Sequence, residues 1–312
     1  VPHLPGGGTL RRLLPEKGCK RIMKRLVILL VVLSGLLFSL VACGSKDAQK
    51  ASTGRIKVVT TLFPLFDFAK QVGGDRAEVT LLLPPGVEPH DFEPKPKDLA
   101  AIQEADIFVY TGRFMEPWAE RILKGIDGKN LLVVDASYGV TLRPPERGDH
   151  PESGKEGHHH GGQNTDPHIW LDLANAQTMV KTIRDGFAKK DPQGIDFYTK
   201  NAQVYNARLK ELDDEYRRGL AECRTRFFLH GGHYAFNYLA RRYNLTYVSV
   251  RGVSPNSEPS AAHLADMVDQ MRRHGLRYMF YEELASPRVA ETIAKETGAG
   301  LLPLLRLGLR FR

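Results

Sequence analysis

The chain has 312 residues and a formal net charge of +8, from 44 Lys and Arg against 36 Asp and Glu. Residues 1–25 contain seven of the basic residues and a single acid, so the rest is near neutral and lacks the basic stripe that binds nucleic-acid phosphates. Three cysteines are too few for a disulfide-rich scaffold. Without the N-terminal segment about 270 residues remain, a length typical of two modest domains.

The N-terminal segment has the pattern of a bacterial lipoprotein signal. Residues 1–22 are rich in Gly and Pro, and we expect them to be a non-native upstream segment. Residues 23–42 begin with Met, continue with a basic pair and an apolar run, and predict a signal peptide. The run closes in Leu40-Val41-Ala42-Cys43, which resembles a lipobox and predicts lipidation of Cys43. The alternative is a single transmembrane anchor, because the run is near the short end of spanning length.

A lipid on Cys43 would tether the rest of the chain to the extracytoplasmic face of the bacterial cell membrane. Residues 43–54 are small and polar and predict a flexible tether. Cys19 lies in the upstream segment, so Cys223 remains alone, and we expect it to be a small buried residue. A lone cysteine predicts neither a disulfide nor a thiolate metal cluster.

Strands alternate with helices through residues 55–142, which predicts an N-terminal α/β lobe with a parallel sheet. The expected strands are Arg55–Thr61, Val79–Leu83, Ile107–Thr111 and Leu131–Asp135. The expected helices are Phe66–Val72, Pro96–Ala105 and Trp118–Leu123.

The middle of the chain predicts a loop and then long helices. Residues 143–167 are rich in Pro, Gly, His and charge and predict a mobile His-rich loop. Residues 168–224 predict linking helices at Ala174–Lys190 and Ile195–Arg224. The second helix has an expected apolar stripe of Phe197, Val204, Leu209, Leu212 and Tyr216.

Residues 225–312 return to alternation and predict a C-terminal α/β lobe. The expected strands are Phe227–His230, Tyr247–Val250, Tyr278–Tyr281 and Leu301–Leu305, and the expected helices are Tyr234–Tyr243, Glu258–His274 and Pro287–Thr297. The predicted fold is therefore α/β, with two lobes of parallel sheet flanked by helices and joined by a long rigid backbone helix.

Three histidines are expected just past a predicted strand or in the loop that leads into one: His90, His168 and His233. A single loop histidine is more often a surface residue or a turn-stabilising hydrogen-bonder. Ligand sites of parallel sheets form at the carboxyl ends of strands, so three such positions favour a metal site. Three neutral imidazoles suit zinc, copper or nickel and leave one tetrahedral position open. His230 competes with His233, which we favour because the following helix should direct it into the cleft.

The run His158-His159-His160 is a separate feature. A flexible histidine run can gather cations weakly and pass them on, or it can be a solvated low-complexity loop. Both interpretations remain open.

The chain resembles the substrate-binding lipoproteins of bacterial zinc ABC transporters, within the metal-binding cluster that also serves manganese and iron. The resemblance covers Lys57 to Gly300. Its motifs are Gly86-Val87-Glu88-Pro89-His90-Asp91-Phe92, Met115-Glu116-Pro117-Trp118, Asp166-Pro167-His168-Ile169-Trp170-Leu171-Asp172, Gly231-Gly232-His233-Tyr234-Ala235-Phe236 and Glu258-Pro259-Ser260.

The resemblance implies two α/β lobes with the metal held between them by His90, His168 and His233. It also implies Zn²⁺ as the bound substrate, an ABC permease as partner, and no enzymatic step; we expect a monomer. Manganese-type relatives tend to place a carboxylate at the position of His233, and imidazole there favours zinc. Outer groups that orient the rings include Asp91, Asp166 or Asp172 as candidates.

The C-terminus departs from the family pattern, because no His, Asp or Glu follows Glu296. We expect the divergent tail to result from a frameshift or truncation, which leaves the fourth ligand open. Water, Glu282, Glu283 or a histidine of the mobile loop could fill that position. Glu282 and Glu283 could equally cap or salt-bridge a helix.

The leading hypothesis is a receptor that captures Zn²⁺ outside the cell, with binding that weakens below about pH 6 as imidazoles become charged. A manganese or iron receptor is the second hypothesis. An extracellular zinc hydrolase is the third, although the sequence has no His-Glu-x-x-His or Gly-x-Ser-x-Gly motif. A surface adhesin with an incidental metal is the fourth.

Overall fold

The computed structural model describes residues 54–84, 87–126, 130–145, 165–282 and 286–304. The upstream segment, the signal peptide, Cys43, the tether up to residue 53, His158 to His160, Glu283 and the tail after Leu304 lie outside the described residues. Within the described part, no helix combines the length and the apolar character needed to cross a bilayer.

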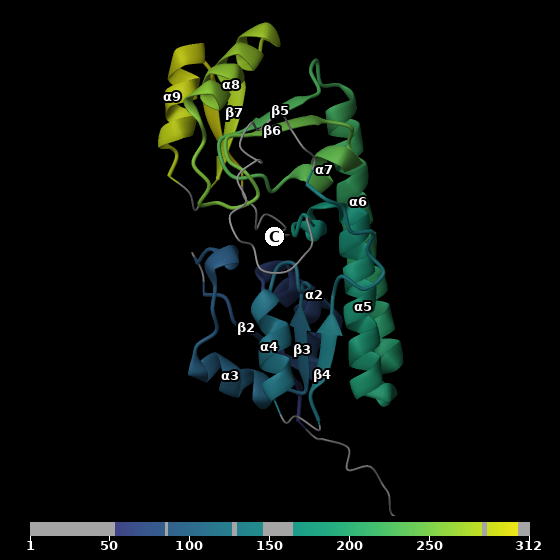
Figure 1. Cartoon of the computed structure of the whole chain (residues 1–312). Coiled ribbons are helices and arrows are strands. Elements are labelled where there is room, and N and C mark those ends of the chain that lie inside the picture. The colour runs from purple at the N-terminus through teal and green to yellow at the C-terminus, as the bar shows by residue number, and fades with distance from the viewer. Residues whose placement is uncertain (1–53, 85–86, 127–129, 146–164, 283–285, 305–312) are drawn as a thin grey trace, which may run out of the picture. The chain divides into compact units, whose positions relative to one another are not determined.

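The first sheet has four parallel strands in the order β2-β1-β3-β4 (Figure 1). Alternate residues of its central strand β3 enter two different cores, as expected for a strand covered on both faces. Ile107 and Val109 pack with Phe68 of α2, whereas Phe108 and Tyr110 pack with Trp118 of α4. The strands are β1 (Ile56–Thr60), β2 (Ala77–Leu81), β3 (Ile107–Tyr110) and β4 (Leu132–Asp135), and the helices are α2 (Phe63–Gly73), α3 (Pro96–Gln103) and α4 (Pro117–Gly125).

The second sheet repeats this arrangement in the order β6-β5-β7-β8, again all parallel. Leu229 of β5 packs on one face with Met267 and Ile293, and Phe228 packs on the other with Phe236. The predicted α/β fold with two parallel sheets is confirmed. The strands are β5 (Phe227–His230), β6 (Thr246–Ser249), β7 (Tyr278–Glu282) and β8 (Gly300–Leu304), and the helices are α7 (Asn237–Arg242), α8 (Ala261–Arg273) and α9 (Arg288–Thr297).

Two long helices, α5 (Leu173–Lys190) and α6 (Ile195–Ala221), run side by side (Figure 1) and lie between the two sheets in the sequence. Both α5 and α6 also pack against α2. The gap between the two predicted helices is a 3-10 turn at Pro192–Gly194, with the backbone N–H of Gly194 donating to the carbonyl of Asp191.

The predicted apolar stripe of α6 is partly wrong. Val204 is 49% exposed and Tyr216 is 39% exposed, whereas Tyr198 and Tyr205 are buried. The tyrosines can be buried because their hydroxyls have carboxylate partners: Tyr198 donates to Asp191 at 2.8 Å, and Tyr205 donates to Asp67 at 2.5 Å.

The expectation for Cys223 is also wrong, since this cysteine is exposed. It follows the end of α6 at Ala221, where the chain turns toward β5. A residue in such a connection has little apolar surface to pack against.

Candidate metal centre

His90 lies in a 3-10 turn at Pro89–Asp91, in the connection between β2 and α3. Pro89 fixes the backbone at the start of the turn, and the N–H of Phe92 donates to its carbonyl at 3.3 Å. The imidazole of His90 is half-buried. The turn therefore presents this ring from a short connection rather than from a strand or a long helix.

His168 immediately precedes a 3-10 turn at Ile169–Leu171, which leads into α5. The ring is buried, and its Nδ1 lies 2.8 Å from Oδ1 of Asp166. The same oxygen accepts the backbone N–H of His168 at 3.0 Å. Burial raises the pKa of Asp166 to about 6, against the lowering effect of that backbone hydrogen bond. Because a carboxylate accepts at Nδ1, the lone pair of His168 is on Nε2.

His233 follows β5 through Gly231-Gly232 and is fully buried. Its Nδ1 lies 2.8 Å from Oε1 of Glu282, the last residue of β7, and its backbone N–H donates to the same oxygen. A Cβ added at Gly232 would lie 1.8 Å from that oxygen, so only glycine leaves room for this arrangement. Glu282 thus holds both the backbone and the ring of His233 in position.

The three rings meet at their Nε2 atoms. Nε2 of His168 lies 3.2 Å from Nε2 of His90 and 3.1 Å from Nε2 of His233. Within the described part of the chain, this is the group of His, Cys, Asp or Glu side chains close enough to share a metal, with all ligand atoms within 4.8 Å of one another. Zinc–nitrogen bonds of about 2.0–2.1 Å in a tetrahedral site place two ligand atoms about 3.3–3.4 Å apart. The spacing therefore suits a single cation.

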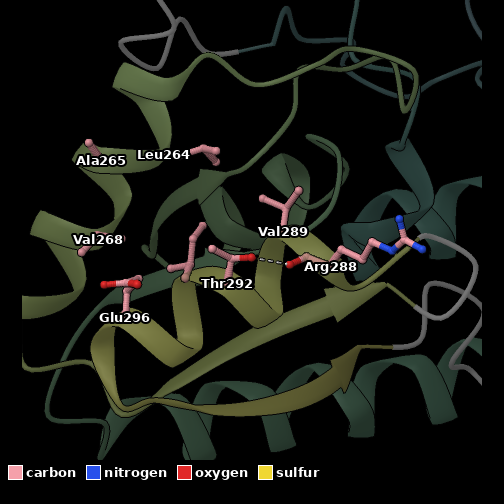
Figure 2. Close-up of a pocket in the computed structure, with 8 residues that line it drawn as sticks. Leu264, Ala265, Val268, Arg288, Val289, Thr292 and Glu296 are labelled. Atoms are coloured by element: carbon pink, nitrogen blue, oxygen red, sulfur yellow. Dashed lines mark hydrogen bonds between the residues drawn. The ribbon is translucent and has the colours of Figure 1, made fainter.

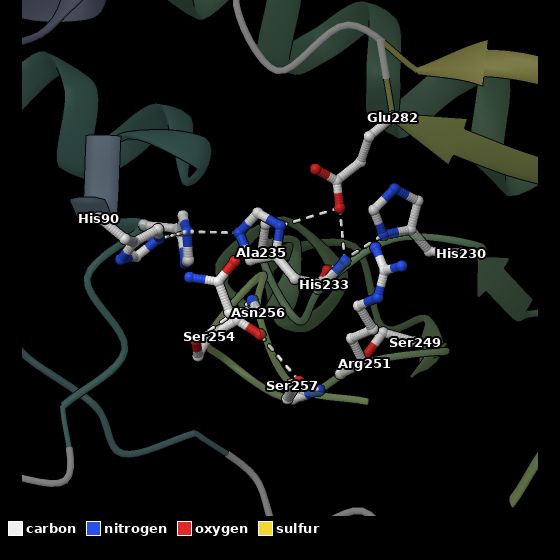
Figure 3. A network of polar contacts seen from close by, with 12 residues as sticks. His90, His230, His233, Ala235, Ser249, Arg251, Ser254, Asn256, Ser257 and Glu282 are labelled. Carbon is white, nitrogen blue, oxygen red and sulfur yellow. Dashed lines mark hydrogen bonds and ion pairs between the residues drawn. The ribbon is translucent and has the colours of Figure 1, made fainter. Parts of the chain in front are cut away.

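The other sequence-predicted residues lie around this cluster. His230 lies next to His233 (Figure 3), with its Nδ1 3.2 Å from the carbonyl of His233. The same nitrogen lies 3.2 Å from the hydroxyl of Tyr247. Glu282 contacts the outer nitrogen of His233, as described above. Asp172 caps α5 by accepting from the backbone N–H of Ala174 at 2.8 Å.

Asp91 faces a residue that the sequence did not single out. Nδ2 of Asn256 lies 3.2 Å from both carboxylate oxygens of Asp91. These residues are 165 positions apart. A search for metal-ligating types passes over an amide, and no spacing in the sequence indicates the pair.

Another buried carboxylate, that of Glu116, lies at the carboxyl ends of β1 and β3. Glu116 accepts hydrogen bonds from the hydroxyl of Thr61 at 2.5 Å and from the backbone N–H groups of Thr111 and Gly112 at 3.1 Å each. Burial nevertheless raises the pKa of Glu116 to about 7, although these hydrogen bonds lower it. The motif Met115-Glu116-Pro117-Trp118 thus contains a carboxylate that ties two strand ends together.

A pocket of about 310 Å³ lies elsewhere, between α8 and α9 (Figure 2). Its lining is mainly apolar, with Arg288 and Glu296 as the charged residues, and it contains none of the candidate ligands. It offers no chemistry for holding a cation.

Comparison with known proteins places the cluster in context. The family described as zinc-uptake complex component A, periplasmic (ZnuA), matches residues 58–309. The chain belongs to this family. It is 40% identical over 279 residues to the zinc-binding lipoprotein AdcA of Streptococcus pneumoniae. The aligned region covers 88% of the chain and 54% of AdcA. The chain thus spans about half the length of that relative.

Other relatives match over most of their length. The chain is 38% identical over 273 residues to the high-affinity zinc uptake system protein ZnuA of Bacillus subtilis, which covers 86% of the chain and 85% of that protein. The crystal structure of the Zn(II)-bound ZnuA-like domain of S. pneumoniae AdcA matches with a TM-score of 0.67 and 37% identity, over 81% of the chain and 88% of the domain. By name, these relatives are a zinc-binding lipoprotein and a protein of a high-affinity zinc uptake system.

Proposed function

We propose that the protein captures Zn²⁺ outside the cytoplasm and delivers it to the permease of an ABC transporter. The observation that supports this most is the convergence of the Nε2 atoms of His90, His168 and His233, at 3.2 and 3.1 Å from one to the next. Capture and release require only exchange of ligands on the cation, so no catalytic step is proposed. The three histidines are the proposed protein ligands of the zinc.

The surroundings of the rings support zinc over a hard ion such as manganese. Neutral imidazole is a better ligand for zinc than for hard ions, which prefer oxygen. The two nearby carboxylates, Asp166 and Glu282, contact the outer nitrogens of the rings and do not supply oxygen to the cluster. Such outer carboxylates raise the basicity of the ligating nitrogen and fix the ring.

The site of action follows from the lipobox. We propose that Cys43 carries a lipid that holds the monomeric protein on the extracytoplasmic face of the membrane, next to its permease. This arrangement keeps a diffusing cation and its importer on the same surface.

Calorimetry of the purified protein with zinc tests the proposal. We expect one zinc per chain, proton release on binding, and weaker binding at pH 5 than at pH 7. The variants His90→Ala, His168→Ala and His233→Ala should each lose more than the roughly 10–100-fold that removal of an outer partner costs. His274→Ala, an exposed histidine at the end of α8, is the matched control. Unchanged affinity in the triple variant would rule out the site, and preference for manganese in a thermal-shift competition would reassign the metal.

A further inference from the structure

The three rings of the cluster are not held in the same way. His168 and His233 are buried, and each contacts a buried carboxylate at 2.8 Å. His90 is half-buried and lies in a three-residue turn closed by backbone hydrogen bonds of 3.3 Å. Of the three proposed ligands, His90 is thus the one that is not fully buried.

The residue next to His90 provides a contact with the other half of the chain. Both carboxylate oxygens of Asp91 lie 3.2 Å from Nδ2 of Asn256, in the connection between β6 and α8. Figure 3 shows Asn256 close to the cluster of rings, on the same side as Ser254 and Ser257. An amide that donates to a carboxylate forms a charge-assisted hydrogen bond, which is stronger than a neutral one.

The loop that carries Asn256 has its own internal support. The hydroxyl of Ser257 accepts the backbone N–H of Gly252 at 2.8 Å and donates to the carbonyl of Ser254 at 2.8 Å. The hydroxyl of Ser254 accepts the backbone N–H of Asn256 at 3.3 Å. Hydrogen bonds within this loop thus hold the backbone around Asn256 in place.

The same loop is fastened to the segment that carries His233. The N–H of Arg251 donates to the carbonyl of Gly232 at 3.0 Å, and the N–H of Tyr234 donates to the carbonyl of Gly252 at 2.8 Å. These two bonds flank His233 in the sequence. A continuous set of contacts therefore runs from the turn of His90, through Asn256, to the backbone on both sides of His233.

We infer that Asn256 is a positioning residue for metal capture: by holding Asp91, it keeps His90 in the cluster formed with His168 and His233. This inference rests on the proposed function. Asn256 touches no ligand atom, and acts through the turn at Pro89–Asp91. Its loss should affect zinc release more than zinc arrival, because most affinity changes within one site appear in the dissociation rate.

The test measures zinc affinity and release in the full chain, with a chromophoric chelator as competitor and rapid mixing for the rate. Asn256→Ala should raise the Kd for zinc about three- to tenfold, the effect of losing one ordinary hydrogen bond, because the contact between Asn256 and Asp91 is exposed. The control is Asn206→Ala. The native Asn206 amide contacts the carbonyl of Gln177 between α5 and α6, and this variant should bind zinc as the native chain does.

A reversed pair separates positioning from general stability and from net charge. Asn256→Asp should weaken zinc binding, because the variant places a second carboxylate against that of Asp91. The double variant Asp91→Asn with Asn256→Asp restores an amide–carboxylate pair at native net charge, and should return the Kd to within about twofold of the native value. The melting temperature with excess chelator should be the same for all variants.

The inference is overturned if Asn256→Ala binds and releases zinc like the native chain, or if the reversed pair is as weak as Asn256→Asp. Equal loss of metal-free stability and affinity would also overturn it, because it would indicate a purely structural residue. Failure of the native chain itself to bind zinc would instead reject the proposed function, so the two outcomes are distinct.

Discussion

Arg242 of α7 donates to both carboxylate oxygens of Asp213 on α6, from Nε to Oδ1 at 2.7 Å and from Nη2 to Oδ2 at 2.6 Å. Its third nitrogen, Nη1, donates to Asp172 at the start of α5 at 2.7 Å. One guanidinium thus ties a helix beside the second sheet to both long helices. Asp172 is four positions after His168, so this contact also supports the loop that presents a proposed ligand.

Replacement of Arg242 should be strongly destabilising. Arg242→Ala removes the bidentate partner of Asp213, whose side chain is 8% exposed and still contacts Tyr243 and Arg217, and we expect a loss of about 2 kcal/mol in the free energy of unfolding. Arg242→Lys should restore only part of this, since an ammonium cannot form the two parallel bonds. Urea denaturation measures both. Lys210→Ala on α6 is the control: its exposed pair with Asp214 should contribute less than about 0.5 kcal/mol.

The same pair predicts a pH dependence at the acid end. Hydrogen bonds from Arg242 lower the pKa of Asp213 to about 2. Since the folded pKa is lowered, the stabilisation is complete above the unfolded value near 4 and is lost as the pH falls toward 2. The difference in unfolding free energy between the native chain and Arg242→Ala should therefore shrink over this range. A constant difference from pH 5 to pH 2 would contradict the assignment.

Gly232 should be irreplaceable for zinc binding. Gly232→Ala places a Cβ against the Glu282 carboxylate, which must move away from His233. We expect zinc affinity to fall about 10–100-fold, the usual cost of losing an outer partner of a ligating histidine, and Glu282→Gln to have a similar effect. Calorimetry measures both variants. Gly219→Ala on α6, where an added Cβ meets no atom within 4 Å, should keep native affinity and raise stability by about 0.5–1 kcal/mol.

Glu116 predicts the opposite pH trend to Asp213. Its folded pKa is raised to about 7 by burial, so the unfolded chain ionises first as the pH rises above about 4. The folded state should therefore lose stability from pH 4 to pH 7, by about 3 kcal/mol at most. The variant Glu116→Gln lacks this carboxyl group, so the pH-dependent contribution of residue 116 to stability is removed. Thermal melts across the range should show the advantage of the native chain over the variant shrinking as the pH rises; a growing advantage would argue against a raised pKa.

Local patterns were sufficient to predict most of the fold. Alternating apolar strands and amphipathic helices predicted both parallel sheets, and the predicted helix ends at Lys190 and Thr297 are the ends of α5 and α9 in the structure. Boundaries were less accurate. The second strand was expected at Val79–Leu83 but is Ala77–Leu81, because Leu82 and Leu83 are buried just after the strand and not within it.

The histidines of the cluster could be proposed from the sequence, whereas the groups that orient them could only be given as alternatives. Each ring lies next to a recognisable turn, so its position relative to a strand is a local property. The partners depend on tertiary placement. Glu282 reaches His233 from 49 positions away, and nothing in the sequence separates the role of Asp166 at a ring nitrogen from that of Asp172 at a helix start.

The three clustered histidines are separated by 78 and 65 positions along the chain. A cation shared by them acts as a cross-link that closes two long loops at once, and such a link can form only after both sheets have been assembled. Zinc should therefore leave the rate of folding unchanged and slow the rate of unfolding. Under the proposed function, the zinc-loaded protein would therefore gain mainly in the lifetime of its folded state.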